Sequence, residues 1–323
     1  MTTSAHPRRR PPATPARLRE GMLQRVEERL RSLLTEEHRG RRTAEPRSTA
    51  LVVGVTELVQ AGVDRVRPVI CLNGFLAAGG DPDGPAADAA VTAAVALEFL
   101  DTCLMIRADV HDNAPMRRGI PTLHISHAAE HERNGWRGES RRFGEGTAVL
   151  AGDLALAYAD RLAARLPHSV RELWDDLRTE RVIGAHADVA AATEYLDDPW
   201  PERCITGCTR GCAAGWYGLH HALLIGASLA GRADLVAVYE EYASALHAAW
   251  RLRGFLEGGP GYDTDAQFLR EVVFGGHARE QAEQSITTLL HRATTTAATA
   301  PVPPDWRTEL TTFAHHVAGH TTR

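Results

Sequence analysis

The sequence predicts an all-α fold, and three observations carry that prediction. Alanine is abundant, aromatic residues make up only 6% of the chain, and runs of β-branched residues are short, which favours helices over strands. Apolar residues recur at helical spacing along most of the chain. No alternating strand pattern and no Gly-rich phosphate loop after a strand is readable. We therefore expect one large helical bundle.

The order of the helices follows from the apolar patterns and from the breaks between them. The segment 86–112 is almost wholly apolar, so it predicts a helix at the centre of the bundle rather than on its surface. Segment 38–48 is basic and turn-rich, segment 124–142 is interpreted as a polar loop, and segment 294–304 as a linker. Helices are predicted over about 15–37, 49–61, 65–78, 86–112, 144–164, 171–196, 204–231, 235–259, 265–293 and 305–320.

Composition narrows the class of protein. The length of 323 residues allows one large or two ordinary domains, and the shares of 44% hydrophobic and 24% charged residues are those of a globular protein. A formal net charge of -5 argues against nucleic acid as a partner. No run of about 18 uninterrupted apolar residues is present, so we expect no transmembrane helix and no stable insertion into a membrane.

The start of the chain and its cysteines predict a location. Residues 1–16 are basic and proline-rich without an apolar core, so we interpret them as a disordered leader rather than a secretory signal, with 17–323 as a single helical domain. Five cysteines, an odd number, in a chain without a signal predict reduced thiols and a cytoplasmic location.

Three of the cysteines, Cys204, Cys208 and Cys212, repeat every fourth residue and so share one stripe of a helix. They could join His220 or His221 in a zinc site, but the spacing lacks the Cys-x-x-Cys turn of common zinc modules. We favour small packing residues where helices approach, for example at a contact between subunits.

The end of the predicted central helix carries the chemistry. Asp109 and Asp112 are separated by three positions and so share a helix face, and Arg117 and Arg118 follow after a short turn. Two carboxylates can hold a hard cation such as Mg2+, and two guanidinium groups can bind the phosphate oxygens that the cation leaves free. The alternative is a pair of exposed helix carboxylates and two surface charges. We predict a site for a phosphorylated ligand.

Several runs resemble one protein family, the trans-isoprenyl diphosphate synthases or polyprenyl synthetases. The Arg65-Val66-Arg67-Pro68 run is similar to the Arg-x-Arg-Pro of the family's first substrate site, and Arg117 to His124 is similar to its Arg-Arg-Gly-Lys-Pro-Thr-x-His. Segments 135–156, 177–188 and 223–231 also resemble family sequences, the first of them in its actinobacterial form. The resemblance covers about residues 50–275.

The resemblance implies a fold, ligands and roles for individual residues. The fold would be the isoprenoid synthase helical bundle around a central apolar cavity, acting on a prenyl diphosphate with Mg2+, as a homodimer or as a heterodimer with an active homologue. Asp109 and Asp112 would bind the metal and, with Arg117, form the catalytic group. The substrate-binding residues would be Arg65, Arg67, Arg117, Arg118 and Arg251, the last at the position of a family Gln.

The departures from the family pattern bear on the reaction. Ala108 stands where the first Asp-rich motif begins, and Gly254, Phe255 and Gly258 replace the three acids of the second motif. Asp64 replaces a family Lys and Asp101 a His or Gln, so two phosphate-facing positions have become acidic. These charges should repel a second diphosphate.

Three functions are compatible with this pattern. The first, which we favour, is an unusual class I enzyme, related to terpene synthases or prenyltransferases, that ionises one allylic diphosphate. The second is a divergent prenyltransferase with an unusual acceptor. The third is a non-catalytic subunit that regulates an active homologue, a reading favoured by the loss of the second acidic motif. Ordinary chain elongation is not expected.

His124, His127 and His131 could also form a metal cluster, but we favour polar loop residues.

Overall fold

The computed structural model describes residues 14–42, 48–62, 65–194, 213–257 and 277–319. Within these ranges the chain is helical apart from short connections and one small β-ladder, which confirms the all-α prediction. The elements are α1 (Pro15–Arg42), α2 (Ser48–Ala61), α3 (Val66–Ala77), α4 (Ala87–His111), β1 (Met116–Arg117), β2 (Ile120–Pro121), α5 (Leu123–Arg133), α6 (Ser140–Ala163), α7 (His168–Glu194), α9 (Ala213–Leu229), a 3-10 turn (Ala233–Leu235), α10 (Val236–Glu257), α12 (His277–Thr299) and α13 (Pro304–Gly319).

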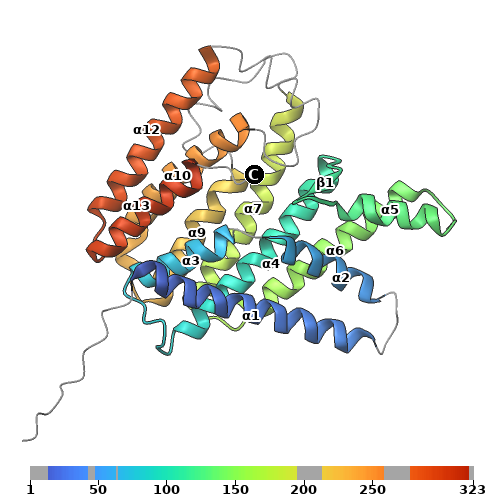
Figure 1. Ribbon diagram of the computed structural model, residues 1–323, viewed down its shortest axis with the longest axis horizontal. Coiled ribbons are helices and arrows are strands. Elements are labelled where there is room, and N and C mark those ends of the chain that lie inside the picture. The colour runs from blue at the N-terminus through green and yellow to red at the C-terminus, as the bar shows by residue number, and fades with distance from the viewer. Residues whose placement is uncertain (1–13, 43–47, 63–64, 195–212, 258–276, 320–323) are drawn as a thin grey trace, which may run out of the picture.

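Helix α4 lies at the centre of the bundle, as its apolar sequence predicts. It packs against α6, α3, α1 and α9 (Figure 1), and residues on all sides of it are buried, among them the consecutive Val95, Ala96 and Leu97. By length and composition α4 is the one described helix that could cross a membrane, but 78% of its most apolar window is buried inside the bundle. Its hydrophobicity is therefore accounted for by the core.

The contact between α3 and α9 depends on two glycines. A Cβ atom at Gly74 would lie 2.5 Å from the carbonyl oxygen of Leu223, and a Cβ atom at Gly226 would lie 2.2 Å from that of Cys71. Both distances are far below van der Waals contact, so only glycine lets the two backbones approach this closely. This contact fixes α3, and with it the segment that carries Arg65 and Arg67.

Helices α10, α12 and α13 pack together along one flank of the bundle, while α5 lies at the opposite end beside α6 (Figure 1). The hydroxyl of Tyr242 in α10 donates to the carbonyl oxygen of Leu310 in α13 at 2.7 Å. Arg253, also in α10, donates to the carbonyl oxygen of Ala318 and to Glu283 of α12. These contacts hold the three helices of this flank together.

Three expectations about local structure were wrong. Helix α1 continues into the basic segment as far as Arg42, because Gly40 alone does not stop it and Glu37 pairs with Arg41 and Arg161. The expected loop 124–142 begins with helix α5, which starts after Thr122 and stops at Asn134. The expected linker is helical to Thr299, and its threonine hydroxyls bond to carbonyl oxygens of the preceding turn.

The predicted leader falls largely outside the described residues, and α1 already begins at Pro15. Segments 195–212 and 258–276 also lie outside them, and with them Cys204, Cys208, Cys212 and Gly258. The single domain and the central cavity stay predictions.

Candidate functional site

One side of α4 carries four carboxylates, which we call the acidic stripe: Glu98, Asp101, Asp109 and Asp112. Their separations of three, eight and three residues place them on one side of the helix over about 21 Å of its length. Glu98 and Asp109 are 2% exposed, whereas Asp101 is half-buried and Asp112 is exposed. The predicted pair Asp109 and Asp112 is therefore the C-terminal end of a longer series.

Three arginines from flanking segments pair with the stripe. Arg65 donates from Nη1 to Glu98 at 2.6 Å, and Arg67 donates from Nη1 to Asp101. Arg117 donates from Nε to Asp109 at 2.7 Å and also contacts it through Nη2. Of the predicted metal-binding acids and arginines, the structure thus brings Asp109 and Arg117 together as an ion pair. Arg65 and Arg67 pair instead with Glu98 and Asp101.

A tight turn places Arg117 over the end of α4. Residues 116–117 pair antiparallel with residues 120–121, and the two residues between the strands, Arg118 and Gly119, have φ values of 52° and 79°. Two left-handed residues in a two-residue loop are the conformation of a type I′ hairpin. Thr122 closes the hairpin, since its hydroxyl donates to the carbonyl oxygen of Ala114 at 2.7 Å. A short polar turn was expected here, and the structure adds the β-ladder.

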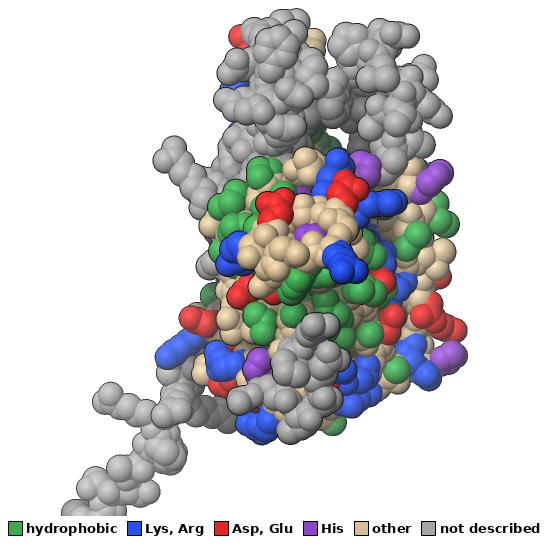
Figure 2. Space-filling view, turned by 90° about the vertical axis from the view of Figure 1, so that its right-hand side faces the viewer, with side chains coloured by type: hydrophobic (Ala, Val, Ile, Leu, Met, Phe, Trp, Pro, Cys, Tyr) green, Lys and Arg blue, Asp and Glu red, His purple; other side chains and the backbone are tan. Residues whose placement is uncertain are grey.

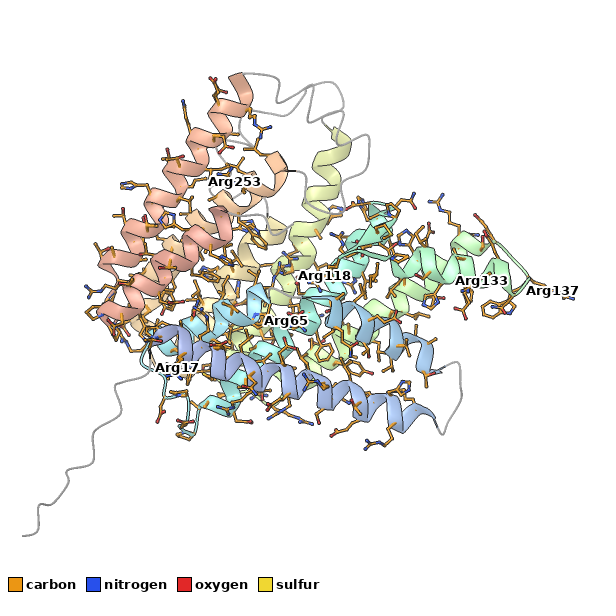
Figure 3. All side chains as sticks on the ribbon, in the orientation of Figure 1. Arg17, Arg65, Arg118, Arg133, Arg137 and Arg253 are labelled. Atoms are coloured by element: carbon orange, nitrogen blue, oxygen red, sulfur yellow. The ribbon has the colours of Figure 1, made fainter. Side chains whose placement is uncertain are left out.

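The turn separates the two arginines of the doublet. Arg117 lies on Asp109, whereas Arg118 donates to the carbonyl oxygen of Leu58 at 3.0 Å. A Cβ atom at Gly62 would meet Nη1 of Arg118 at 2.5 Å and Nη1 of Arg65 at 2.8 Å, so both guanidinium groups lie against this glycine. Figure 3 labels Arg65 and Arg118 near the middle of the bundle. The guanidinium group of Arg118 therefore lies beside Arg65, at the Glu98 end of the acidic stripe, and not beside Asp109.

Arg65 is the most enclosed of these cations. It is 6% exposed, it precedes α3 in a left-handed conformation with φ 44°, and besides Glu98 it bonds Glu27 of α1 through Nε at 2.6 Å. Burial acts to lower the pKa of Arg65, but the hydrogen bonds and charges of Glu27 and Glu98 raise it overall. The substrate-binding role predicted for Arg65 stays a prediction, and in this structure its donors are used by carboxylates.

Burial also shifts the pKa values of the acids and of the nearby His124. It raises the pKa of Asp109, and the hydrogen bond and charge of Arg117 offset this only in part. It raises the pKa of Glu98 in the same way, opposed by Arg65. His124 is 4% exposed, with both ring nitrogens buried and without a hydrogen-bond partner, and burial lowers its pKa against the charges of Asp109 and Glu145. A neutral imidazole therefore lies near Asp109.

The residues at the end of α4 fit a magnesium ion that arrives with its ligand. Asp112 is exposed and bonded by His111 at 2.8 Å, while Asp109 is held by Arg117. Among the described residues, no group of three His, Cys, Asp or Glu side chains is placed to hold a metal by itself. Mg2+ is commonly bound by one or two carboxylates together with substrate phosphates. Asp109 and Asp112 can supply the two carboxylates of such a site.

Other predicted site residues lie elsewhere. The side chain of Arg251 and the whole of Asp64 are outside the described part of the chain, so their roles stay predictions. Of the three α5 histidines, His127 pairs with Glu130 and His131 with the carbonyl oxygen of Arg137.

Two residues of the site were not predicted from the sequence. Glu98 has the same helical spacing to Asp101 that Asp109 has to Asp112, and this repeated interval was the available signal. Glu27, in contrast, reaches Arg65 from another helix across 38 positions of sequence, and no local pattern reveals such a partner.

Comparisons with known proteins point to one family. Residues 50–242 match the family model for polyprenyl synthetase. The chain is 33% identical over 150 residues to the large subunit 1 of a heterodimeric geranylgeranyl pyrophosphate synthase of Arabidopsis thaliana, covering 42% of this chain and 34% of that protein. It is 34% identical over 120 residues to a farnesyl diphosphate synthase of Geobacillus stearothermophilus, covering 35% of this chain and 33% of that protein. The chain thus spans about a third of the length of these curated relatives.

The fold is shared over nearly the whole chain. The geranylgeranyl pyrophosphate synthase of Corynebacterium glutamicum, solved in complex with isoprenyl diphosphate and magnesium, superposes with a TM-score of 0.79 at 23% identity, covering 92% of this chain and 98% of that one. The family match extends over more than half of the sequence and includes α4, both arginines of the doublet and the Arg65–Arg67 segment. This chain belongs to the polyprenyl synthetase family.

Proposed function

We propose that this protein binds one prenyl diphosphate at the end of α4 and ionises its allylic C–O bond. The observation that carries the proposal is the Arg117–Asp109 ion pair with Asp112 one turn further along the helix. This arrangement offers a guanidinium group to phosphate oxygens and two carboxylates to a cation on the same ligand. The family to which the chain belongs supports a prenyl diphosphate as that ligand.

The chemistry would be divided among few residues. Bound Mg2+ would supply charge neutralisation for the diphosphate leaving group. Arg117 would donate hydrogen bonds to phosphate oxygens as their negative charge develops. His124, buried and without a hydrogen-bond partner, would keep a neutral imidazole rather than a second cation beside Asp109. The carbocation would then lose a proton to the released diphosphate, with or without cyclisation, or capture water, as in a terpene synthase. In a divergent prenyltransferase an unusual acceptor would capture it instead.

A second candidate function is a regulatory subunit, and a surface feature supports it. On α6, Phe143 and Leu150 are separated by seven residues and lie on one stripe, where they are 37% and 57% exposed. Trp136 stacks edge-on against Phe143 and is also exposed. Figure 2 faces the end of the bundle that bears α5 and shows hydrophobic side chains there. We propose that a second bundle, identical or homologous, covers this stripe.

A heterodimer with an active homologue is supported by the Arabidopsis relative, which is itself named a heterodimeric large subunit. We also propose a cytoplasmic location, which the odd number of cysteines in the sequence supports.

Product analysis tests the proposal and separates the candidates. Purified protein is incubated with geranyl, farnesyl or geranylgeranyl diphosphate and Mg2+, with and without isopentenyl diphosphate. A hydrocarbon or alcohol formed without isopentenyl diphosphate supports the favoured function. A product that requires another acceptor supports the divergent prenyltransferase. No product alone, but an altered chain length in a mixture with a partner synthase, supports the regulatory subunit and contradicts the first function.

A further inference from the structure

The hairpin that carries Arg117 is tied to the end of α4 at its base. The backbone N–H of Ala114 donates to the carbonyl oxygen of Asp109 at 3.0 Å. From the other end of the hairpin, Thr122 donates to the carbonyl oxygen of Ala114 through its hydroxyl at 2.7 Å and to that of Pro115 through its N–H at 3.1 Å. Thr122 is fully buried. The base of the hairpin is therefore fixed on the helix that carries the acidic stripe.

The tip of the hairpin is tied to a different helix. Nη1 of Arg118 donates to the carbonyl oxygen of Leu58 at 3.0 Å. Leu58 lies in the last turn of α2, which ends at Ala61, and the carbonyl oxygens of the last four residues of a helix have no partner within that helix. The C-terminal end of a helix also carries a partial negative charge, which favours a cation there. Arg118 thus caps α2 from the tip of the hairpin.

The backbone of Arg118 gives a second reason to assign a role to its side chain. Its φ of 52° is uncommon for a residue with a Cβ atom, and the first position of a type I′ turn is usually Asn, Asp or Gly. Arginine therefore brings no advantage to the turn itself, and contacts of its side chain must offset the conformational cost. The bond to Leu58 and the packing against Gly62 are such contacts.

We propose that Arg118 is a positioning residue, which anchors the hairpin to α2 and so holds the guanidinium group of Arg117 on Asp109. The hairpin is fixed at its base by Thr122 and at its tip by Arg118, with Arg117 between the two anchors. This inference rests on the proposed function, because it concerns the arginine that would bind the diphosphate. It differs from the substrate-binding role predicted from the sequence, since Arg118 acts through Arg117 rather than on the ligand.

A double-mutant cycle on the free energy of unfolding tests the inference without any ligand. Arg118→Asn and Arg118→Gly both suit the left-handed turn but remove the anchor. Arg117→Ala should cost at most about half as much stability in either Arg118 variant as in the wild type, because the ion pair with Asp109 is already loosened there. A side chain that only capped α2 would lower stability independently of Arg117. Additive losses in both cycles therefore overturn the inference.

Arg25→Gln is the matched control for the unfolding cycle. Arg25 is half-buried, as Arg118 is, and it also donates to a backbone carbonyl oxygen, that of Pro82, at 2.7 Å. Because Arg25 lies on α1 and does not contact the hairpin through this bond, its loss should be additive with that of Arg117→Ala. Coupling of the control to Arg117 as strong as that of Arg118 would overturn the inference.

Calorimetric titration with farnesyl diphosphate and Mg2+ gives a second readout. Arg118→Asn should weaken binding about threefold or more, because Arg117 is no longer held in place for the diphosphate. The double variant Arg118→Asn with Arg117→Ala should bind no more weakly than Arg117→Ala alone. If the double variant is weaker by about a further tenfold, Arg118 donates to the ligand itself and the inference is overturned. Wild-type protein that does not bind farnesyl diphosphate contradicts the proposed function, whereas the unfolding cycle decides the role of Arg118 in either case.

Discussion

The guanidinium group of Arg117 is bonded to the carboxylate of Asp109, and only 3% of the Asp109 side chain is exposed. The hairpin with its left-handed Arg118 and Gly119 holds this contact in place. The cation expected to bind phosphate therefore neutralises the acid expected to bind metal. A magnesium–diphosphate ligand can replace both partners at once, since it offers an anion to Arg117 and a cation to Asp109.

Removal of Arg117 should affect both stability and binding. Arg117→Ala leaves a buried carboxylate without its partner, and we expect a loss of about 1–3 kcal/mol in the free energy of unfolding. We also expect prenyl diphosphate to bind at least about tenfold more weakly. Arg107→Ala is the control, because Arg107 on α4 pairs with Asp153 on α6 and their side chains are 41% and 53% exposed. Denaturant unfolding and calorimetry should show little change for this control, and equal losses in both variants would contradict the role of Arg117.

The glycines between α3 and α9 should be intolerant of substitution. Gly226→Ala places a methyl group against the backbone of α3, and we expect a loss of roughly 2 kcal/mol or more because both backbones must move apart. Gly146→Ala on α6 meets no atom within 4 Å, so it should stabilise the helix by about 0.5–1 kcal/mol. Thermal unfolding of the two variants measures the difference. A Gly226→Ala protein as stable as the wild type would show that the helices are not packed so closely.

Stability should depend on pH through His220. Burial, followed by the charge of His221, lowers the pKa of His220 from 6.5 to about 4. The unfolded chain therefore binds a proton between these values while the folded chain does not, so folding is disfavoured progressively as the pH falls from about 6.5 to about 4. The full effect is at most about 3 kcal/mol. Urea unfolding at pH 7 and pH 5 should show that His220→Gln flattens this dependence, and an unchanged slope would contradict the assignment.

The thiols of α3 and α4 should be unreactive in the folded protein. Burial raises the pKa of Cys71 to about 12 and also raises that of Cys103. Since the thiolate is the reacting form, iodoacetamide should leave both residues unmodified under native conditions and label them after denaturation. Peptide mass spectrometry measures this directly. Rapid native labelling of Cys71 would show that α3 opens away from the core.

The sequence predicted the helices that have a clear apolar pattern, α4 above all, and the family motifs placed the acids beside the arginines. Helix α5 was missed because His, Glu and Arg fill it, although Pro121-Thr122 and Asn134-Gly135 mark its ends. The end of α1 was missed because the ion pairs of Glu37 with Arg41 and Arg161 form only in the folded bundle.

The pairing within the site could not be predicted from the sequence for a similar reason. Asp101 was expected to repel a second diphosphate, but its bond to Arg67 depends on how α3 packs against α4. The division of the arginine doublet depends on the left-handed conformation of Arg118, which is uncommon for a residue other than glycine. Both features follow from tertiary packing rather than from local sequence.

The most direct test of the proposed function is the rate of pyrophosphate release from farnesyl diphosphate with Mg2+ and without isopentenyl diphosphate. Wild-type protein should release pyrophosphate, and Asp109→Asn or Arg117→Ala should lower the rate at least about a hundredfold. The Arg107→Ala control should match the wild type. Two results would contradict an ionising site at the end of α4. One is no release of pyrophosphate from geranyl, farnesyl or geranylgeranyl diphosphate, and the other is an equal rate of release in the wild type and all of these variants.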